Sequence, residues 1–114
     1  MKKKRGRTKK FRVVRQDPKI SQFSPRGRPG RPDESELTKD ELEAVRLADF
    51  IGMSQKEAAR SMRVSQQTFS RIIRRARKLI ADGLVGGKII RIQGGSCVIR
   101  SEEQVTKSQG TSHK

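Results

Sequence analysis

The chain has 114 residues, of which 31% are hydrophobic, and it contains no Trp or Tyr. This length is enough for one small domain and leaves little for a second. The apolar residues are mostly confined to residues 37–99, so we expect one compact core there and disorder at both ends. A chain this short has too few residues to wall a deep catalytic cleft, which argues against an enzyme.

The net charge of +16 is distributed unevenly along the chain. Residues 1–32 carry thirteen basic and one acidic side chains, residues 33–61 carry four and eight, and residues 62–100 carry nine and one. Residues 101–114 are neutral and predict a disordered tail. This pattern predicts a surface that faces a polyanion, with an acidic support behind it. Charge alone fits DNA, RNA or an anionic membrane equally well.

The composition provides no covalent or metal framework. Cys97 is the single cysteine and His113 the single histidine, so we expect no disulfide, no metal and no cofactor. We interpret Cys97 as a small, half-buried apolar residue. No run approaches the roughly 20 apolar residues of a membrane span, and the N-terminus lacks the apolar stretch of a signal peptide. We therefore expect a cytoplasmic protein that does not contact a membrane.

Residues 1–32 predict a flexible basic arm rich in Pro and Gly. Within the arm, residues 11–15 are a candidate for a short strand. Residues 16–32 contain all four prolines, with glycines between them, and predict an extended linker.

The linker contains Arg-Gly-Arg-Pro at residues 26–29, which matches the core of an AT-hook. In that motif Gly lets the backbone approach a narrow minor groove, and each Arg lies along the floor of the groove. Arg26, Gly27 and Arg28 are therefore candidate minor-groove residues. The alternative, which we favour, is a structural linker that packs on the first helix.

The first predicted helix begins at Thr38, which forms a capping box with Glu41, and it ends at Gly52. Apolar residues cover more than half of its helical wheel, so we expect it to pack on two neighbours. We interpret its carboxylates as a solvated face that also favours the helix dipole: Asp40, Glu41 and Glu43. No base, nucleophile or phosphate-binding loop accompanies them, which again argues against catalysis.

Two further helices follow after short connections. Ser54 and Glu57 form a second capping box, and Ser65 caps a helix over residues 66–81. Two helices joined by a short turn, with small inward residues, are the outline of a helix-turn-helix. We therefore predict an all-α fold, a three-helix helix-turn-helix domain over residues 33–87.

The turn departs from the general helix-turn-helix pattern at Arg63, where Gly is usual. A left-handed conformation at Arg63 would cost on the order of 1 kcal/mol.

The third helix has two opposed faces. At about 100° per residue its apolar residues fall within an arc of roughly 140°: Phe69, Ile72, Ile73, Ala76, Leu79, Ile80 and Leu84. The opposite face is cationic and has no carboxylate before Asp82. Because an ordinary solvated helix mixes charge signs, we expect this face to enter the major groove of double-stranded DNA.

Position along the third helix predicts the role of each side chain. Residues in its first turns are expected to contact base edges: Gln66, Gln67, Ser70 and Arg71. Phosphate contacts are expected from residues further along and from the start of the preceding helix: Arg74, Arg75, Arg77, Lys78, Gln55 and Lys56. A lone helix-turn-helix binds weakly, so we expect a homodimer on two half-sites.

Three motifs in order carry a family resemblance: FSPRGRP, LTKDELEAVRLAD and GMSQKEAARSMRVSQQTFSRIIRRARKLIADGLVGGKIIRIQGG. Together they resemble a small prokaryotic family of uncharacterised, predicted DNA-binding proteins, and the resemblance covers residues 11–95. The helix-turn-helix of that family is similar to region four of sigma factors. The resemblance implies a helical DNA-binding fold and a role in transcription regulation, and it implies no target sequence.

Residues 88–93 and 96–100 are β-rich runs separated by two glycines, and they predict a short hairpin over residues 88–100. One alternative is that the hairpin touches DNA through Arg91 or Arg100. Another is that the first run pairs with residues 11–15 or with a second subunit. We favour a structural role.

Two other functions stay open at this point. RNA binding is the first, because a basic arm serves RNA equally well, although four scattered Phe residues do not make a stacking platform. An adaptor that binds RNA polymerase through Asp40 and Glu43 is the second. A non-specific minor-groove binder using residues 26–29 is a variant of the DNA hypothesis.

Overall fold

The structure is a computed structural model that describes residues 11–27, 30 and 32–100. The elements follow in the order β1 (Arg12–Val14), β2 (Gln22–Phe23), β3 (Glu34–Leu37), α1 (Lys39–Val45), η2 (Arg46–Ile51), α2 (Gln55–Met62), α3 (Gln66–Gly86), β4 (Ile89–Ile92) and β5 (Cys97–Ile99). The predictions for residues 1–10 and 101–114 lie outside the described residues.

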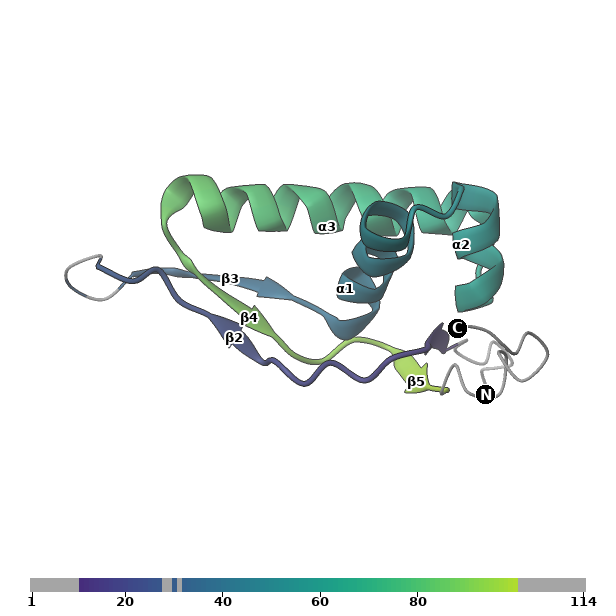
Figure 1. The fold of residues 1–114 in the computed structure, drawn as a ribbon, viewed down its shortest axis with the longest axis horizontal. Coiled ribbons are helices and arrows are strands. Elements are labelled where there is room, and N and C mark those ends of the chain that lie inside the picture. Colours follow the sequence, from purple (N-terminus) through teal and green to yellow (C-terminus); the bar gives the residue numbers. More distant parts are fainter. Residues whose placement is uncertain (1–10, 28–29, 31, 101–114) are drawn as a thin grey trace, which may run out of the picture.

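The prediction of an all-α fold is wrong, because two sheets accompany the helices. β1 and β5 form a parallel pair. β4 is the central strand of a second sheet, antiparallel to β2 and parallel to β3. In Figure 1 this second sheet lies beneath the C-terminal half of α3. Residues 11–27, predicted as part of a disordered arm, therefore contribute two strands, and the strand expected at residues 11–15 is confirmed as β1.

The predicted hairpin of β4 with β5 does not form. β2 and β3 occupy both edges of β4, so no edge is left for β5. Gly94 and Gly95, with φ of 73° and 101°, instead lead the chain away to β1. This leaves β5 paired with β1, where the Arg100 N–H donates to the Val14 carbonyl at 2.8 Å.

The predicted helix starts are confirmed. Thr38 and Ser54 each begin a helix with a complete capping box, and the Ser65 Oγ accepts from the Thr68 N–H at 3.0 Å. α1 continues into η2, a π-helical segment that ends at Gly52 with φ of 91°. These ends depend on residues three or four positions apart, which the sequence displays directly.

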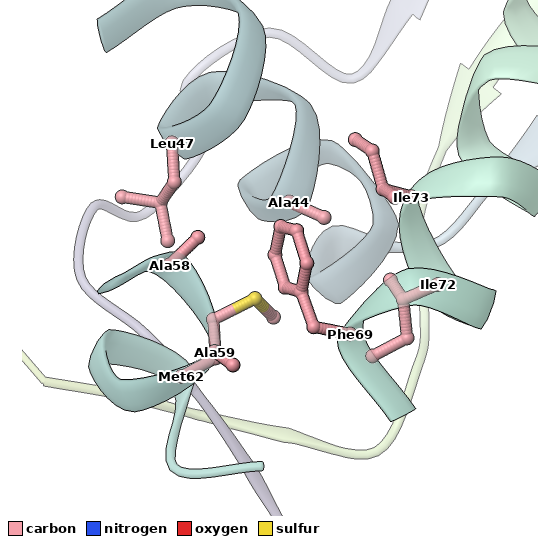
Figure 2. Packing of buried hydrophobic residues seen from close by; sticks show 8 residues of the cluster. All are labelled: Ala44, Leu47, Ala58, Ala59, Met62, Phe69, Ile72 and Ile73. Atoms are coloured by element: carbon pink, nitrogen blue, oxygen red, sulfur yellow. The ribbon is translucent and has the colours of Figure 1, made fainter. Parts of the chain in front are cut away.

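Two hydrophobic clusters divide α3 between them. The N-terminal half of α3 packs on α1, η2 and α2 through Ala44, Leu47, Ala58, Ala59, Met62, Phe69, Ile72 and Ile73. In Figure 2 the Phe69 ring points from α3 toward Ala44, and the Met62 side chain lies beside it. The C-terminal half packs on the second sheet through Leu37, Ala76, Ile90 and Ile92. Both ends of α3 are therefore fixed to the core.

α3 is longer than the predicted range of residues 66–81, because Gly83 lies inside the helix rather than at its end. A Cβ at Gly83 would lie 2.5 Å from Cγ1 of Ile90. The glycine therefore lets α3 approach β4 closely.

Candidate nucleic-acid interface

The connection between α2 and α3 is a tight left-handed turn. Arg63 has φ of 57° and ψ of 45°, and it is the one non-glycine residue with positive φ among the described residues. The Arg63 N–H donates to the Arg60 carbonyl at 3.1 Å, and the Val64 N–H donates to the Ala59 carbonyl at 3.0 Å. These two bonds satisfy the last carbonyls of α2 and direct the chain into α3.

The outward side of α3 carries the side chains that the sequence assigned to DNA. In Figure 1 α3 lies along one edge of the molecule, and the strands lie on the opposite side. Gln66, Gln67 and Arg71, assigned to base edges, are exposed, and Ser70 is half-buried. The structure brings these four residues together on the first two turns of the helix.

The side chains of three cations of α3 make no hydrogen bond or ion pair with any described residue: Arg71, Arg74 and Lys78. All three are exposed. Their spacing of three and four residues places them on one face of the helix. This stripe therefore keeps its full positive charge available to a polyanion.

Arg75 and Arg77 differ from that stripe because each holds an acid. Arg75 Nε lies 2.9 Å from Glu41 Oε2, and Arg77 binds Asp49 with two hydrogen bonds of 2.7 and 3.1 Å. The hydrogen bonds from Arg77 lower the pKa of Asp49 and raise the pKa of Arg77. These two arginines tie α3 to α1 and η2, although both side chains stay largely exposed.

The first turns of α2 and its C-terminal end add further cations. Lys56, predicted to contact a phosphate, is exposed, whereas Gln55 is half-buried. Arg60 and Arg63 are also exposed, and neither was among the predicted contact residues. The signal was available, because Arg60 follows Lys56 by four residues on one face of α2.

We call six residues of α2, the turn and α3 the free cations, because the side chain of none of them has a hydrogen-bond or ion-pair partner within the described part of the chain: Lys56, Arg60, Arg63, Arg71, Arg74 and Lys78.

The carboxylates of α1 are buried, so the interpretation of Asp40, Glu41 and Glu43 as a solvated face is wrong. Arg12 Nη1 lies 2.6 Å from Asp40 Oδ2, and Glu43 accepts from Arg46 Nε at 2.8 Å. Glu43 also accepts from the Arg15 N–H at 2.9 Å. The sequence could not show this burial, because Arg12 lies 28 residues from its partner.

The AT-hook-like stretch is only partly described. Arg26 and Gly27 are exposed, Gly27 has φ of 80°, and Arg28 lies outside the described residues. Just before them, Phe23 and Pro25 line a small pocket together with Gly83 and Leu84 at the C-terminal end of α3. Phe23 also lines an apolar groove together with Leu42 of α1. Whether the stretch is a linker that packs on the first helix stays a prediction.

Three further observations on the described residues concern metal ligands, the cysteine and membrane helices. No group of three His, Cys, Asp or Glu side chains there is placed to hold a metal ion. Burial, and then the charge of Asp40, raises the pKa of the half-buried Cys97 thiol. None of the described helices is long and apolar enough to cross a membrane.

The fold and the site define a small mixed α/β protein whose longest helix carries a cationic stripe. The chain belongs to the family described as protein of unknown function DUF134, whose sequence profile matches residues 1–100. A UPF0251 protein of Prosthecochloris aestuarii is 50% identical over 101 residues, which are 88% of this chain and 64% of the relative. The chain thus spans less than two thirds of that protein.

Other relatives are covered more fully. A UPF0251 protein of Thermoanaerobacter sp. is 48% identical over 99 residues, 86% of this chain and 88% of the relative. One of Methanococcus maripaludis is 44% identical over 101 residues, 88% of this chain and 78% of the relative. No solved structure matches the chain.

Proposed function

We propose that this chain is a sequence-specific DNA-binding protein, a transcriptional regulator, that reads the major groove with α3. In this proposal α2, the turn at Arg63 and α3 are a helix-turn-helix similar to region four of sigma factors. The observation that carries the proposal is the set of free cations, which includes the stripe of Arg71, Arg74 and Lys78. Binding needs no cofactor, and we propose no catalytic activity.

Base readout is assigned to the first two turns of α3. Gln67 and Arg71 are exposed there and differ by four residues, so they share one face of the helix. Gln can form a bidentate pair with adenine, and Arg with guanine, in the major groove. Gln66 and the half-buried Ser70 flank them and supply further hydrogen-bonding groups.

Phosphate contacts are assigned to the remaining free cations. Arg74 and Lys78 continue the stripe along α3, while Lys56 and Arg60 approach from α2. Arg75 and Arg77 act first as positioning residues, because their acids fix α3 against α1 and η2. Because both side chains remain exposed, their guanidinium groups can also contact a phosphate.

The burial of α1 weakens the adaptor alternative. That hypothesis required Asp40 and Glu43 to face a protein partner, yet the two residues are only 1% and 2% exposed. The positions of the aromatic residues also give little support to the RNA-binding hypothesis. Exposed aromatic residues occur singly on different segments, with Phe11 before β1, Phe23 on β2 and Phe50 on η2. Stacked bases need neighbouring platforms.

The test is a titration against duplex DNA at several salt concentrations, with sequences first selected from a random pool. The double substitution Arg71→Ala and Arg74→Ala removes one base contact and one phosphate contact. Affinity for the selected duplex should fall at least about tenfold, because a bidentate base contact alone is worth about 1–3 kcal/mol. The slope of log affinity against log salt should fall by about one to two.

A matched control removes two cations that are already paired with acids. Lys88 follows the end of α3 and binds Asp82, and Arg91 lies on β4 and binds Glu34. Lys88→Ala with Arg91→Ala should change affinity and salt slope much less than the α3 pair. Equal losses from the two pairs would contradict groove binding by α3. A loss only from Arg26→Ala with Arg28→Ala would favour the minor-groove alternative.

A further inference from the structure

An apolar groove opens between the C-terminal half of α3 and the sheet of β2, β3 and β4. It has a volume of about 240 Å³ and is lined by apolar side chains alone: Phe23, Leu37, Leu42, Ile80, Leu84, Ile90 and Ile92. The second hydrophobic cluster is therefore open on this side, whereas the first is closed by α2. Large apolar side chains stand at its rim, with Phe23 57% exposed and Leu84 72% exposed.

We propose that a second copy of this chain covers the groove, so that the protein is a symmetric dimer joined at the C-terminal ends of its two α3 helices. Val85 is 89% exposed and directly follows Leu84, which lines the groove. In a two-fold contact the same patch meets itself. The projecting Leu84 and Val85 of each copy can then enter the groove of the other.

The two terminal segments outside the described residues offer few apolar side chains to the groove. Residues 1–10 contain a single apolar residue, Met1, among seven basic ones. Residues 101–114 contain a single apolar residue, Val105. Neither segment offers the run of apolar side chains that would replace water over seven apolar lining residues.

The distribution of charge also favours contact between two copies at this end. Two copies of a chain with a net charge of +16 repel each other unless they approach through a neutral surface. Two cations near the groove are neutralised, because Lys88 Nζ lies 2.9 Å from Asp82 Oδ2 and Arg91 Nη2 lies 2.8 Å from Glu34 Oε2. The free cations lie on α2, the turn and the preceding part of α3.

The position of the groove along α3 fits a two-half-site operator, and this step rests on the proposed function. Arg71 and Leu84 are 13 residues apart in α3, which corresponds to about 20 Å at about 1.5 Å per residue. Two copies that meet at Leu84 would hold their Arg71 residues up to about 40 Å apart, and less when the helices are inclined. Adjacent major grooves on one side of DNA are about 34–36 Å apart.

The test measures the mass of the full chain in solution without DNA, by analytical ultracentrifugation at micromolar concentration. Leu84→Glu and Val85→Glu each place a charge at the proposed contact, and both positions are exposed, so both variants should fold. Phe50→Glu is the matched control, since Phe50 is 84% exposed on η2, away from the groove. Circular dichroism should confirm unchanged helix content in all three.

The wild type and Phe50→Glu should sediment with twice the mass of one chain, and Leu84→Glu and Val85→Glu as monomers. A monomeric wild type, a folded Leu84→Glu that stays dimeric, or a Phe50→Glu that dissociates would overturn the proposal. Arg71→Ala with Arg74→Ala should remain dimeric. A dimer that binds no duplex would reject the DNA function and leave the interface standing, whereas a monomer that binds duplex would do the reverse.

Discussion

The charged side chains of α1 and α3 differ in burial and in pairing. The carboxylates of α1 are almost fully buried, and each bonds to an arginine from another part of the chain or from the next turn. The cations of the α3 stripe are exposed and bond to no described residue. The acids of α1 are therefore bonded inside the domain, where they join β1, η2 and α3 to α1.

This difference shows which part of the chain carries uncompensated positive charge. Because the α1 acids are already bonded inside, they do not neutralise the stripe formed by Arg71, Arg74 and Lys78. The α1 acids therefore stabilise the fold, while the cations of the stripe remain available to a polyanion. Substitutions of the α1 acids should therefore lower stability, whereas substitutions of the α3 cations should lower binding.

The largest effect is expected from Glu43→Ala. Glu43 is 2% exposed and accepts from the Arg46 side chain and the Arg15 N–H, at 2.8 and 2.9 Å. Removing one partner of a buried ion pair leaves an uncompensated charge and an unpaired amide, so the free energy of unfolding should fall by about 3–5 kcal/mol. Urea denaturation followed by circular dichroism measures the change.

The control for Glu43 comes from the other side of the comparison. Arg74→Ala removes an exposed side chain without a described partner, so unfolding should change by less than about 0.5 kcal/mol. If Arg74→Ala cost as much stability as Glu43→Ala, the cations of α3 would be structural. The contrast between the two helices would then be lost.

A smaller effect is expected at the turn that precedes α3. α1 begins at an extended Thr38, whereas α3 follows Arg63 in the left-handed conformation, with φ of 57°. Arg63→Gly should raise the free energy of unfolding by about 1 kcal/mol, because glycine adopts this conformation without the Cβ clash. Thermal and urea unfolding check the gain.

Arg63→Ala separates strain from charge, because it removes the cation but keeps the Cβ. It should give no comparable gain in stability. Equal gains from Gly and Ala would show that relief of charge repulsion, and not backbone strain, is responsible.

Features that depend on near neighbours in sequence could be predicted. The capping boxes at Thr38 and Ser54 and the cap at Ser65 need residues only three apart, and all three are present. The outward positions of α3 follow from helical periodicity, which predicts an exposed face with Gln67, Arg71 and Arg74, and all three are exposed. This part of the candidate site needed no tertiary information.

Features that depend on distant partners could not be predicted. β2 and β3 are short and acquire their strand character by pairing with β4, more than fifty residues later. The third helix was predicted to end at residue 81, because the sequence does not show that Ile90 packs against Gly83 and lets the helix continue past it. The sequence does not distinguish Arg75 and Arg77 from Arg74, because the acids that bind them lie 34 and 28 residues away.

The smallest effect is expected at the exposed pair of Asp49 and Arg77. The hydrogen bond from Arg77 lowers the pKa of Asp49, so the pair stabilises the folded state above the ordinary pKa of an aspartate. That stability is lost as the pH falls through the lowered pKa of the folded state. Because both side chains are about half exposed, solvent and salt screen the pair.

Asp49→Asn should therefore lower the free energy of unfolding at neutral pH by less than about 1 kcal/mol. The difference from wild type should shrink in acid, where Asp49 is protonated, and again in high salt, where the pair is screened. Urea unfolding at neutral and acidic pH, each at low and high salt, measures both trends. A loss as large as that of Glu43→Ala, unchanged by salt, would mean that burial is not what separates the acids of α1 from Asp49.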